Sequence, residues 1–463
     1  MSFISTEFAC LFVLCFAACY LVGQRFRKAV LLASSCIFIG YFHVGFLLVA
    51  VAVALFAYGA GILIEKTADR PGRQQAAFWG ACLCLVLCWT GFRYAGKLTG
   101  TSILFPLGIS FYTFQALAYL TEVYWGEEKA ERNVTDFLLY MLLFLKFLSG
   151  PIERPGSLLA QVKELRPATY PMMTYGAKLI LVGLIKKLMI ADHLGPYIDH
   201  VFASVHEASG VQLLMAALLY PVELYADFSG YTDMAVGGAL LFGLRLSPNF
   251  DRPFTSQTTA EFWRRWHISL SSWVRDYLYL PLASVVRGWG QWGIAGSLLV
   301  TFVALGVWHG AGWTFVVYGL IQGIVIVWEQ RTAKARNALR DRLGNRLFTL
   351  LSQVRTYLVF ALSLIFFKAQ TLEEAFYYIG HLSFRVHSSW KEVSIGIPDR
   401  SCIVAGATLL LLLVYEHFMA RGDVLQRLER QPAALRWALY YLFVFVLFAY
   451  GKFGTENFIY LQF

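Results

Sequence analysis

The chain has 463 residues, of which 58% are hydrophobic and only 15% are charged, and its mean hydropathy is +0.57. Soluble domains usually contain about 25% charged residues, so this composition excludes a soluble globular protein, and the low charge and 16% aromatic content exclude disorder. The net charge of +10 lies in short clusters beside apolar runs, which is typical of membrane topology signals and not of a nucleic-acid-binding face. The sequence therefore predicts an all-α polytopic membrane protein with one domain over residues 1–463.

Apolar runs recur along the whole chain. Because one membrane-spanning helix needs about 20 apolar residues, the sequence has room for about ten to twelve membrane segments. The first run carries Glu7 and no basic residue, which favours a membrane helix over a cleavable signal peptide. The clearest runs are 3–22, 44–64, 76–96, 103–125, 136–149, 172–191, 211–226, 294–328, 347–367, 402–420 and 435–453.

Two stretches of the sequence do not fit a helix that simply crosses the membrane. Residues 29–42 would form about 21 Å of helix at about 1.5 Å per residue, which is too short for a hydrocarbon core of about 30 Å. We therefore expect a re-entrant, tilted or half-spanning segment there. Residues 221–293 are amphipathic and rich in Trp, Arg, Asp and Pro, so we expect this part to lie along the interface or inside the helix bundle.

Clusters of basic residues place several loops on the cytoplasmic side, because cytoplasmic loops carry an excess of Lys and Arg. The densest cluster falls within residues 331–346, where it is opposed only by Asp341. This orientation puts the tail, residues 453–463, on the outer side of the membrane. The cluster residues are Arg25, Arg27 and Lys28; Lys66, Arg70 and Arg73; and Arg331, Lys334, Arg336, Arg340, Arg342 and Arg346.

The cysteines and the carboxylates of the middle region favour structural roles. All eight cysteines lie in or beside apolar stretches without a Cys-x-x-Cys pair, so the sequence predicts neither a disulfide framework nor a metal site. Three carboxylates, Glu223, Asp227 and Asp233, enter an otherwise apolar region. Together with Ser229 and Tyr231 they can cap helix ends and bind Arg side chains.

His309 is the first candidate for chemistry, because ionisable groups at membrane depth are costly and invite a functional explanation. It lies near the middle of the apolar run 294–328, which is too long for one helix and just long enough for two, so we expect a helix break at or near His309. Glycines at 306, 310 and 312 would let a ligand or another helix approach the backbone closely. The structural alternative is a histidine that is hydrogen-bonded to a neighbouring helix.

His267 is the second candidate. If residues 261–281 form a helix, Trp263, Trp266 and Leu270 share one face with His267 beside it. The alternative is an interfacial amphipathic helix that carries out no chemistry. A histidine near neutral pKa can act as a general base, and two of them around a tunnel would suit the transfer of an acyl group to a hydroxyl.

A series of motifs, in the same order along nearly the whole chain, resembles the membrane-bound O-acyltransferase (MBOAT) family and, within it, the bacterial alginate O-acetyltransferase branch. In that family the histidine of the Trp-His-Gly motif, here His309, is catalytic, and the histidine of the Arg-Trp-His motif, here His267, lies close by. The resemblance also implies an MBOAT-type helical bundle with re-entrant and interfacial helices around a central funnel. The motifs occupy residues 225–235, 249–254, 261–271 and 306–310, with support from 106–114, 149–155 and 458–463.

The resemblance implies an O-acyltransferase, and we expect an acetyltransferase of the cell inner membrane that modifies an extracytoplasmic polysaccharide. Its acyl donor would be acetyl-CoA or an acyl-carrier thioester, with no tightly bound cofactor, and a periplasmic acetyltransferase would complete the transfer. Two alternatives stay open on the residues alone: a transporter or channel in which the buried histidines relay protons, and a membrane haem protein with His267 and His309 as axial ligands. The sequence leaves the polymer undefined among alginate, cellulose, peptidoglycan and other exopolysaccharides.

Overall fold

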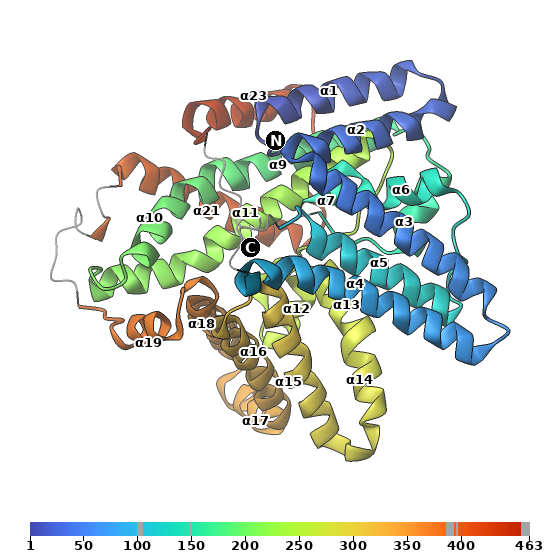
Figure 1. Cartoon of the computed structure of the whole chain (residues 1–463). Helices are drawn as coiled ribbons and strands as arrows, with labels where there is room; N and C mark the ends of the chain where they lie inside the picture. The colour runs from blue at the N-terminus through green and yellow to red at the C-terminus, as the bar shows by residue number, and fades with distance from the viewer. Residues whose placement is uncertain (100–104, 149, 386–392, 395–396, 455–463) are drawn as a thin grey trace. The chain divides into compact units, whose positions relative to one another are not determined.

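The structure is a computed structural model that describes residues 1–99, 105–148, 150–385, 393–394 and 397–454 (Figure 1). Over these residues the chain is helical, and the β-structure is limited to one isolated bridge between Phe250 and Trp266. Eight of the described helices are long and apolar enough to cross a membrane: α3, α4, α11, α15, α16, α18, α21 and α23. The predicted all-α polytopic class is therefore confirmed.

The chain divides into two compact units, each built from separate stretches of sequence. The first unit comprises Met1–Gly183 and Tyr231–Pro248, and the second comprises Leu184–Gly230 and the described part of Asn249–Thr455. Helix α11 (Gly210–Leu241) contributes residues to both units. The prediction of a single domain stays a prediction.

The first unit packs its amino-terminal helices through aromatic side chains. Phe8 of α1, Phe38 of α2 and Phe144 of α7 are all buried, and the ring centroids of Phe8 and Phe38 lie 5.8 Å apart. Helix α2 has 16 residues, or about 24 Å at about 1.5 Å per residue, which confirms that this segment is too short for a simple crossing. The helices are α1 (Thr6–Leu21), α2 (Arg27–Phe42), α3 (Val44–Lys66), α4 (Pro71–Thr99), α5 (Ile109–Trp125), α6 (Val134–Leu142), α7 (Phe144–Phe147), α8 (Ala160–Lys163) and nearly all of α9 (Tyr170–Ile185).

The second unit contains the two candidate histidines. Helices α15 and α16 run side by side as a hairpin, and α18 packs against α16 (Figure 1). The helices are α10 (Asp192–Ala203), α12 (Thr259–Arg265), α13 (Ile268–Val274), α14 (Leu280–Val285), α15 (Gly290–His309), α16 (Trp313–Arg331), α17 (Ala333–Leu343), α18 (Asn345–Lys368), α19 (Leu372–Gly380), α21 (Asp399–Met419), α22 (Val424–Glu429) and α23 (Ala433–Tyr450).

Two of the predicted segments have different limits in the structure. The run expected to end at residue 226 continues as α11 to Leu241, because the polar side chains that interrupt it are accommodated inside the fold. The run 136–149 is divided between the short helices α6 and α7, since Leu143 leaves the helical conformation with ψ of 113°. Neither of these two short helices is long enough to span a membrane.

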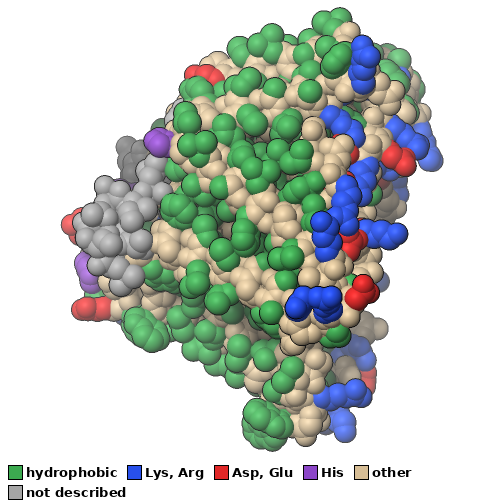
Figure 2. All heavy atoms as spheres, turned by 45° about the vertical axis from the view of Figure 1, so that its right-hand side comes forward, with side chains coloured by type: hydrophobic (Ala, Val, Ile, Leu, Met, Phe, Trp, Pro, Cys, Tyr) green, Lys and Arg blue, Asp and Glu red, His purple; other side chains and the backbone are tan. Residues whose placement is uncertain are grey.

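The outer surface is suited to lipid. On the face shown in Figure 2, hydrophobic side chains form broad patches, and Lys and Arg side chains lie in clusters apart from them. Helix α23 is an extreme case, since Tyr441 and Phe445 are each 69% exposed and Phe448 is 71% exposed. Such an apolar face would be costly in water but is stable against acyl chains.

Candidate active site

His309 is the last residue of α15, at the break that the sequence predicts. Gly310 follows in an extended conformation, and α16 begins at Trp313, so the apolar run does form two helices. The imidazole is buried at 6% exposure against the edges of aromatic rings. Its centroid lies 4.7 Å from that of Trp308, 5.1 Å from that of Phe367 and 6.4 Å from that of Tyr318.

Glycines around His309 allow α15 and α16 to pack closely. A Cβ on Gly306 would lie 2.2 Å from the carbonyl oxygen of Phe315, and a Cβ on Gly310 would lie 2.0 Å from the ring of Phe315. Gly319 makes the reciprocal approach from α16, because its Cβ would lie 2.2 Å from the carbonyl oxygen of Phe302. Of the two expected reasons for these glycines, the structure confirms the close approach of another helix.

His267 lies between two short helices and not within one, so the prediction of a helix over 261–281 is wrong. Its φ of 44° ends α12 at Arg265 and lets α13 begin at Ile268. The break is held by a neighbouring stretch, because Asp251 N–H donates to Arg265 C=O at 2.9 Å and Ile268 N–H donates to Asn249 C=O at 2.9 Å. These are tertiary hydrogen bonds, which a periodicity argument does not detect.

The interfacial alternative for His267 stays open, although the side chain is buried in the fold and only 1% exposed. The ring packs edge-on against Phe228 of α11 at a centroid distance of 4.7 Å. Burial lowers the pKa of His267 well below its ordinary value, and the nearby His309 lowers this pKa further. Burial and the charge of His309 thus both favour the neutral form of the His267 ring.

Asn249 determines which nitrogen of His267 carries the proton. Its Oδ1 accepts hydrogen bonds from the backbone N–H and the hydroxyl of Ser269, at 3.1 and 2.9 Å, which identifies this atom as the oxygen. The same oxygen lies 3.1 Å from Nδ1 of His267, so Nδ1 must be the donor. Nε2 of the neutral ring then carries the lone pair. Asn249 belongs to the motif at residues 249–254, and helical periodicity gives no signal for its contact with His267.

The helix before His267 is anchored to α16 and α18. Thr259 N–H, at the start of α12, donates to the buried carboxylate of Glu329 at 2.9 Å. Further along α12, Trp263 Nε1–H donates to Gln322 at 3.0 Å, and the amide of Gln322 donates to Ser363 Oγ at 2.8 Å. These hydrogen bonds connect α12 to the hairpin that carries His309.

The carboxylates of the middle region lie within a helix and not at its ends. Glu223, Asp227 and Asp233 all lie in the interior of α11, where backbone N–H groups are already bonded within the helix. Asp227 pairs with Lys187 at 2.6 Å, and Lys187 also contacts Asp192 at 2.8 Å. Although burial opposes it, the two carboxylates raise the pKa of Lys187. Asp227 thus pairs with a lysine, where the sequence predicted an arginine.

Comparison with known proteins shows the family to which the chain belongs. The sequence model of the MBOAT, membrane-bound O-acyltransferase family, matches residues 131–342, a range that includes both histidines and Asn249. The "Probable alginate O-acetylase AlgI" of Pseudomonas aeruginosa is 34% identical over 93% of this chain and 83% of its own length. The chain belongs to the membrane-bound O-acyltransferase family. It is an O-acyltransferase of a membrane, as predicted.

Other MBOAT relatives carry different names. The "Peptidoglycan O-acetyltransferase" of Helicobacter pylori is 28% identical over 77% of this chain and 73% of its own. The "Teichoic acid D-alanyltransferase" of Bacillus subtilis is 29% identical over 54% of this chain and 65% of its own. Family membership favours the acyltransferase hypothesis over the transporter and haem alternatives. Of the predicted motifs, residues 458–463 and Ser149 lie outside the described part of the chain, as does most of the tail predicted to be extracytoplasmic.

Proposed function

We propose that this MBOAT protein transfers an acetyl group from a cytoplasmic thioester towards a hydroxyl on the outer side of the inner membrane, for O-acetylation of an extracytoplasmic polysaccharide. The names of the relatives support this proposal, since they act on alginate, peptidoglycan and teichoic acid. The donor is acetyl-CoA or an acetylated carrier protein. A periplasmic acetyltransferase is the partner that delivers the group to the polymer.

His309 acts as the general base in this proposal. It accepts the proton of the acceptor hydroxyl while the hydroxyl oxygen forms a bond to the thioester carbonyl carbon. The tetrahedral oxyanion then collapses, the carbon–sulfur bond breaks, and His309 returns the proton to the departing thiolate. The products are an ester and a thiol. The apolar ring contacts around His309 support such a role, because exclusion of water strengthens interactions with the developing charge.

His267 orients the acceptor hydroxyl and does not perform the proton transfer. With Nδ1 donating to Asn249, Nε2 can accept a hydrogen bond from that hydroxyl. Its lowered pKa favours the form in which Nε2 is unprotonated. The observation that carries the proposal is a pair of buried histidines, with His267 bonded to Asn249 through Nδ1 and His309 at the end of α15 among aromatic rings.

The decisive experiment replaces His309. His309→Ala and His309→Asn should abolish acetyl transfer, because neither side chain can accept the proton, while the protein still accumulates in the membrane. Release of thiol from acetyl-CoA or from an acetylated carrier protein, with a periplasmic partner present, measures the activity. His417→Ala is the matched control, since His417 is exposed on α21. Wild-type transfer by a well-expressed His309→Ala variant would contradict the assignment, and loss of the protein from the membrane would favour a structural role.

A further inference from the structure

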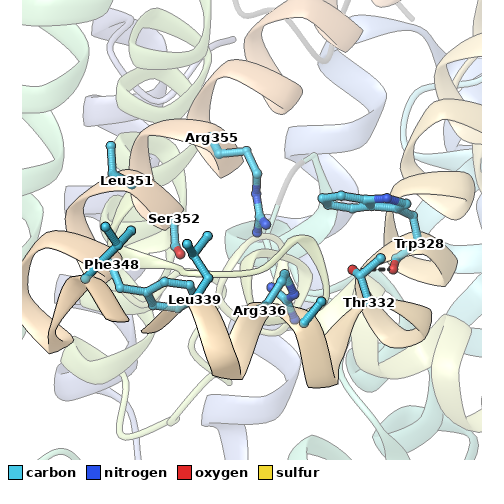
Figure 3. Close-up of a pocket in the computed structure, with 10 residues that line it drawn as sticks. Trp328, Thr332, Arg336, Leu339, Phe348, Leu351, Ser352 and Arg355 are labelled. Carbon is cyan, nitrogen blue, oxygen red and sulfur yellow. Dashed lines mark hydrogen bonds between the residues drawn. The ribbon is translucent and has the colours of Figure 1, made fainter. Parts of the chain in front are cut away.

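A pocket away from the histidines lies where α16, α17 and α18 meet in the second unit. Its volume is about 360 Å³, within the range of about 300–1,000 Å³ that is common for small-molecule sites. Most of the wall is apolar, with Trp328 on one side and Leu339, Phe348 and Leu351 on the other (Figure 3). Several of these side chains are open to the surroundings, since Trp328 is 48% and Leu351 is 50% exposed.

Two guanidinium groups enter this apolar pocket. Figure 3 shows Arg355 extending from α18 toward Arg336 on α17, so that two positive charges share the same space. Arg355 is partly neutralised by the buried Glu329 at 2.6 Å, whereas Arg336 makes only a 3.3 Å contact to the backbone carbonyl of Glu329 among the hydrogen bonds of the described chain. The Nε atoms of both arginines are buried and lack a hydrogen-bond partner within the described residues.

The surroundings of the pocket are strongly basic. Helix α17 and its flanks carry six basic residues against one acidic residue, Asp341, which lies 3.9 Å from Arg340. The second carboxylate near the pocket, Glu329, is already used by Arg355 and by the start of α12. Two guanidinium groups that approach each other in a positive field favour an anion, because an anion would both accept hydrogen bonds from them and reduce their repulsion.

We propose that this pocket binds an anionic phospholipid of the membrane. The phosphate would contact Arg336 and Arg355, and one acyl chain would lie against the apolar wall. A soluble anion would leave this wall in water, whereas a lipid would cover it. The location agrees with a lipid, since α16 and α18 are candidate membrane spans and the pocket lies at their α17 ends, with a tryptophan of the kind that is enriched at membrane interfaces. This inference does not rest on the proposed function.

The test measures lipid binding to the delipidated full-length protein in detergent. Native mass spectrometry would follow titration with dioleoylphosphatidylglycerol and, separately, with zwitterionic dioleoylphosphatidylcholine. We expect the anionic lipid to bind at least tenfold more tightly. Arg336→Gln should lower its affinity about 10- to 100-fold, because hydrogen bonds to charged groups are worth about 1.5–3 kcal/mol. The control Arg342→Gln removes the same charge from an exposed position of α17 outside the pocket and should change the affinity less than twofold.

A second variant tests the apolar wall. Leu339→Gln keeps both arginines and should also weaken the binding of phosphatidylglycerol. It should leave any binding of inorganic phosphate unchanged. Equal affinity of wild type and Arg336→Gln for phosphatidylglycerol would overturn the proposal, as would equal affinity of the wild type for the two lipids. Displacement of the lipid by inorganic phosphate or by acetyl-CoA at micromolar concentration would overturn it in favour of a soluble ligand. Because the readout is binding, failure here leaves the catalytic proposal intact.

Discussion

The backbone conformation of His267 bears directly on the proposed chemistry. Among the described residues other than glycine, only His267 and Arg252 have a positive φ, at 44° and 47°. For a residue with a Cβ this conformation costs about 1–2 kcal/mol, so the surrounding structure must impose it. The hydrogen bonds that the His267 ring and the backbone N–H of Ser269 donate to Asn249 Oδ1 provide that constraint. The conformation thereby places the ring where His309 influences its pKa.

A pair of substitutions at residue 267 separates this strain from the chemistry. Both His267→Ala and His267→Gly should lower turnover about 10²-fold, near the small end of general acid–base effects, because both remove the imidazole. The glycine variant should nevertheless be more stable than the alanine variant by about 1 kcal/mol, since glycine adopts positive φ without penalty. Thermal unfolding and thiol release measure the two effects. An unchanged rate in either variant would contradict the assisting role.

Because His267 donates from Nδ1 to Asn249, a substitution at Asn249 should change the pH dependence of the reaction. In Asn249→Asp a carboxylate would face Nδ1, and its charge would raise the pKa of His267 from its lowered value. Protonation of Nε2 would then begin at higher pH, so the acidic limb of the pH–rate profile should move upward and activity should recover in alkaline buffer. Asn249→Ala is the control, because it should reduce turnover at every pH without moving that limb upward. Identical acidic limbs for wild type and Asn249→Asp would contradict this view of His267.

At the scale of elements, the lengths of the apolar runs predicted the helix break at His309 but not the helix break at His267. The length of the run 294–328 predicted two helices with a break at or near His309, which the structure confirms. The break at His267 depends on pairing with Asn249 and Asp251, which are distant enough in sequence to be invisible to helical periodicity. The extent of α11 was missed for a similar reason, because its carboxylate Asp227 is stabilised by Lys187 from another element.

The hairpin of α15 and α16 gives a prediction with an internal control. Gly306→Ala would place a Cβ 2.2 Å from the carbonyl oxygen of Phe315, so the helices must separate and His309 must move. We expect loss of most acetyl transfer together with a lower unfolding temperature. Gly296→Ala on the same helix meets nothing within 4 Å, so it should leave both measurements close to wild type. Equal behaviour of the two variants would show that close helix packing does not position His309.

At the scale of the whole molecule, the distribution of charge bears on the donor and on the side of entry. The basic clusters predicted to face the cytoplasm would attract an anionic donor. These charges say little about the fold, which is determined by the apolar helices. The sequence could therefore predict the class, whereas the orientation stays a prediction. It could not predict the limits of the short helices, because membrane depth alone does not determine where polar side chains find partners. The central funnel implied by the family resemblance stays a prediction.

Ionic strength should separate electrostatic attraction of the donor from catalysis. Because the Debye length falls from about 30 Å at 0.01 M to about 8 Å at 0.15 M, added salt screens attraction between the basic clusters and the phosphates of acetyl-CoA. We expect kcat/KM for acetyl-CoA to fall over this range while kcat changes little. The uncharged donor S-acetyl-N-acetylcysteamine is the control, and its kcat/KM should be independent of salt. If neither donor nor an acetylated carrier protein is consumed, while a solute crosses sealed vesicles that contain the protein, the transporter alternative would replace the proposed acyl transfer.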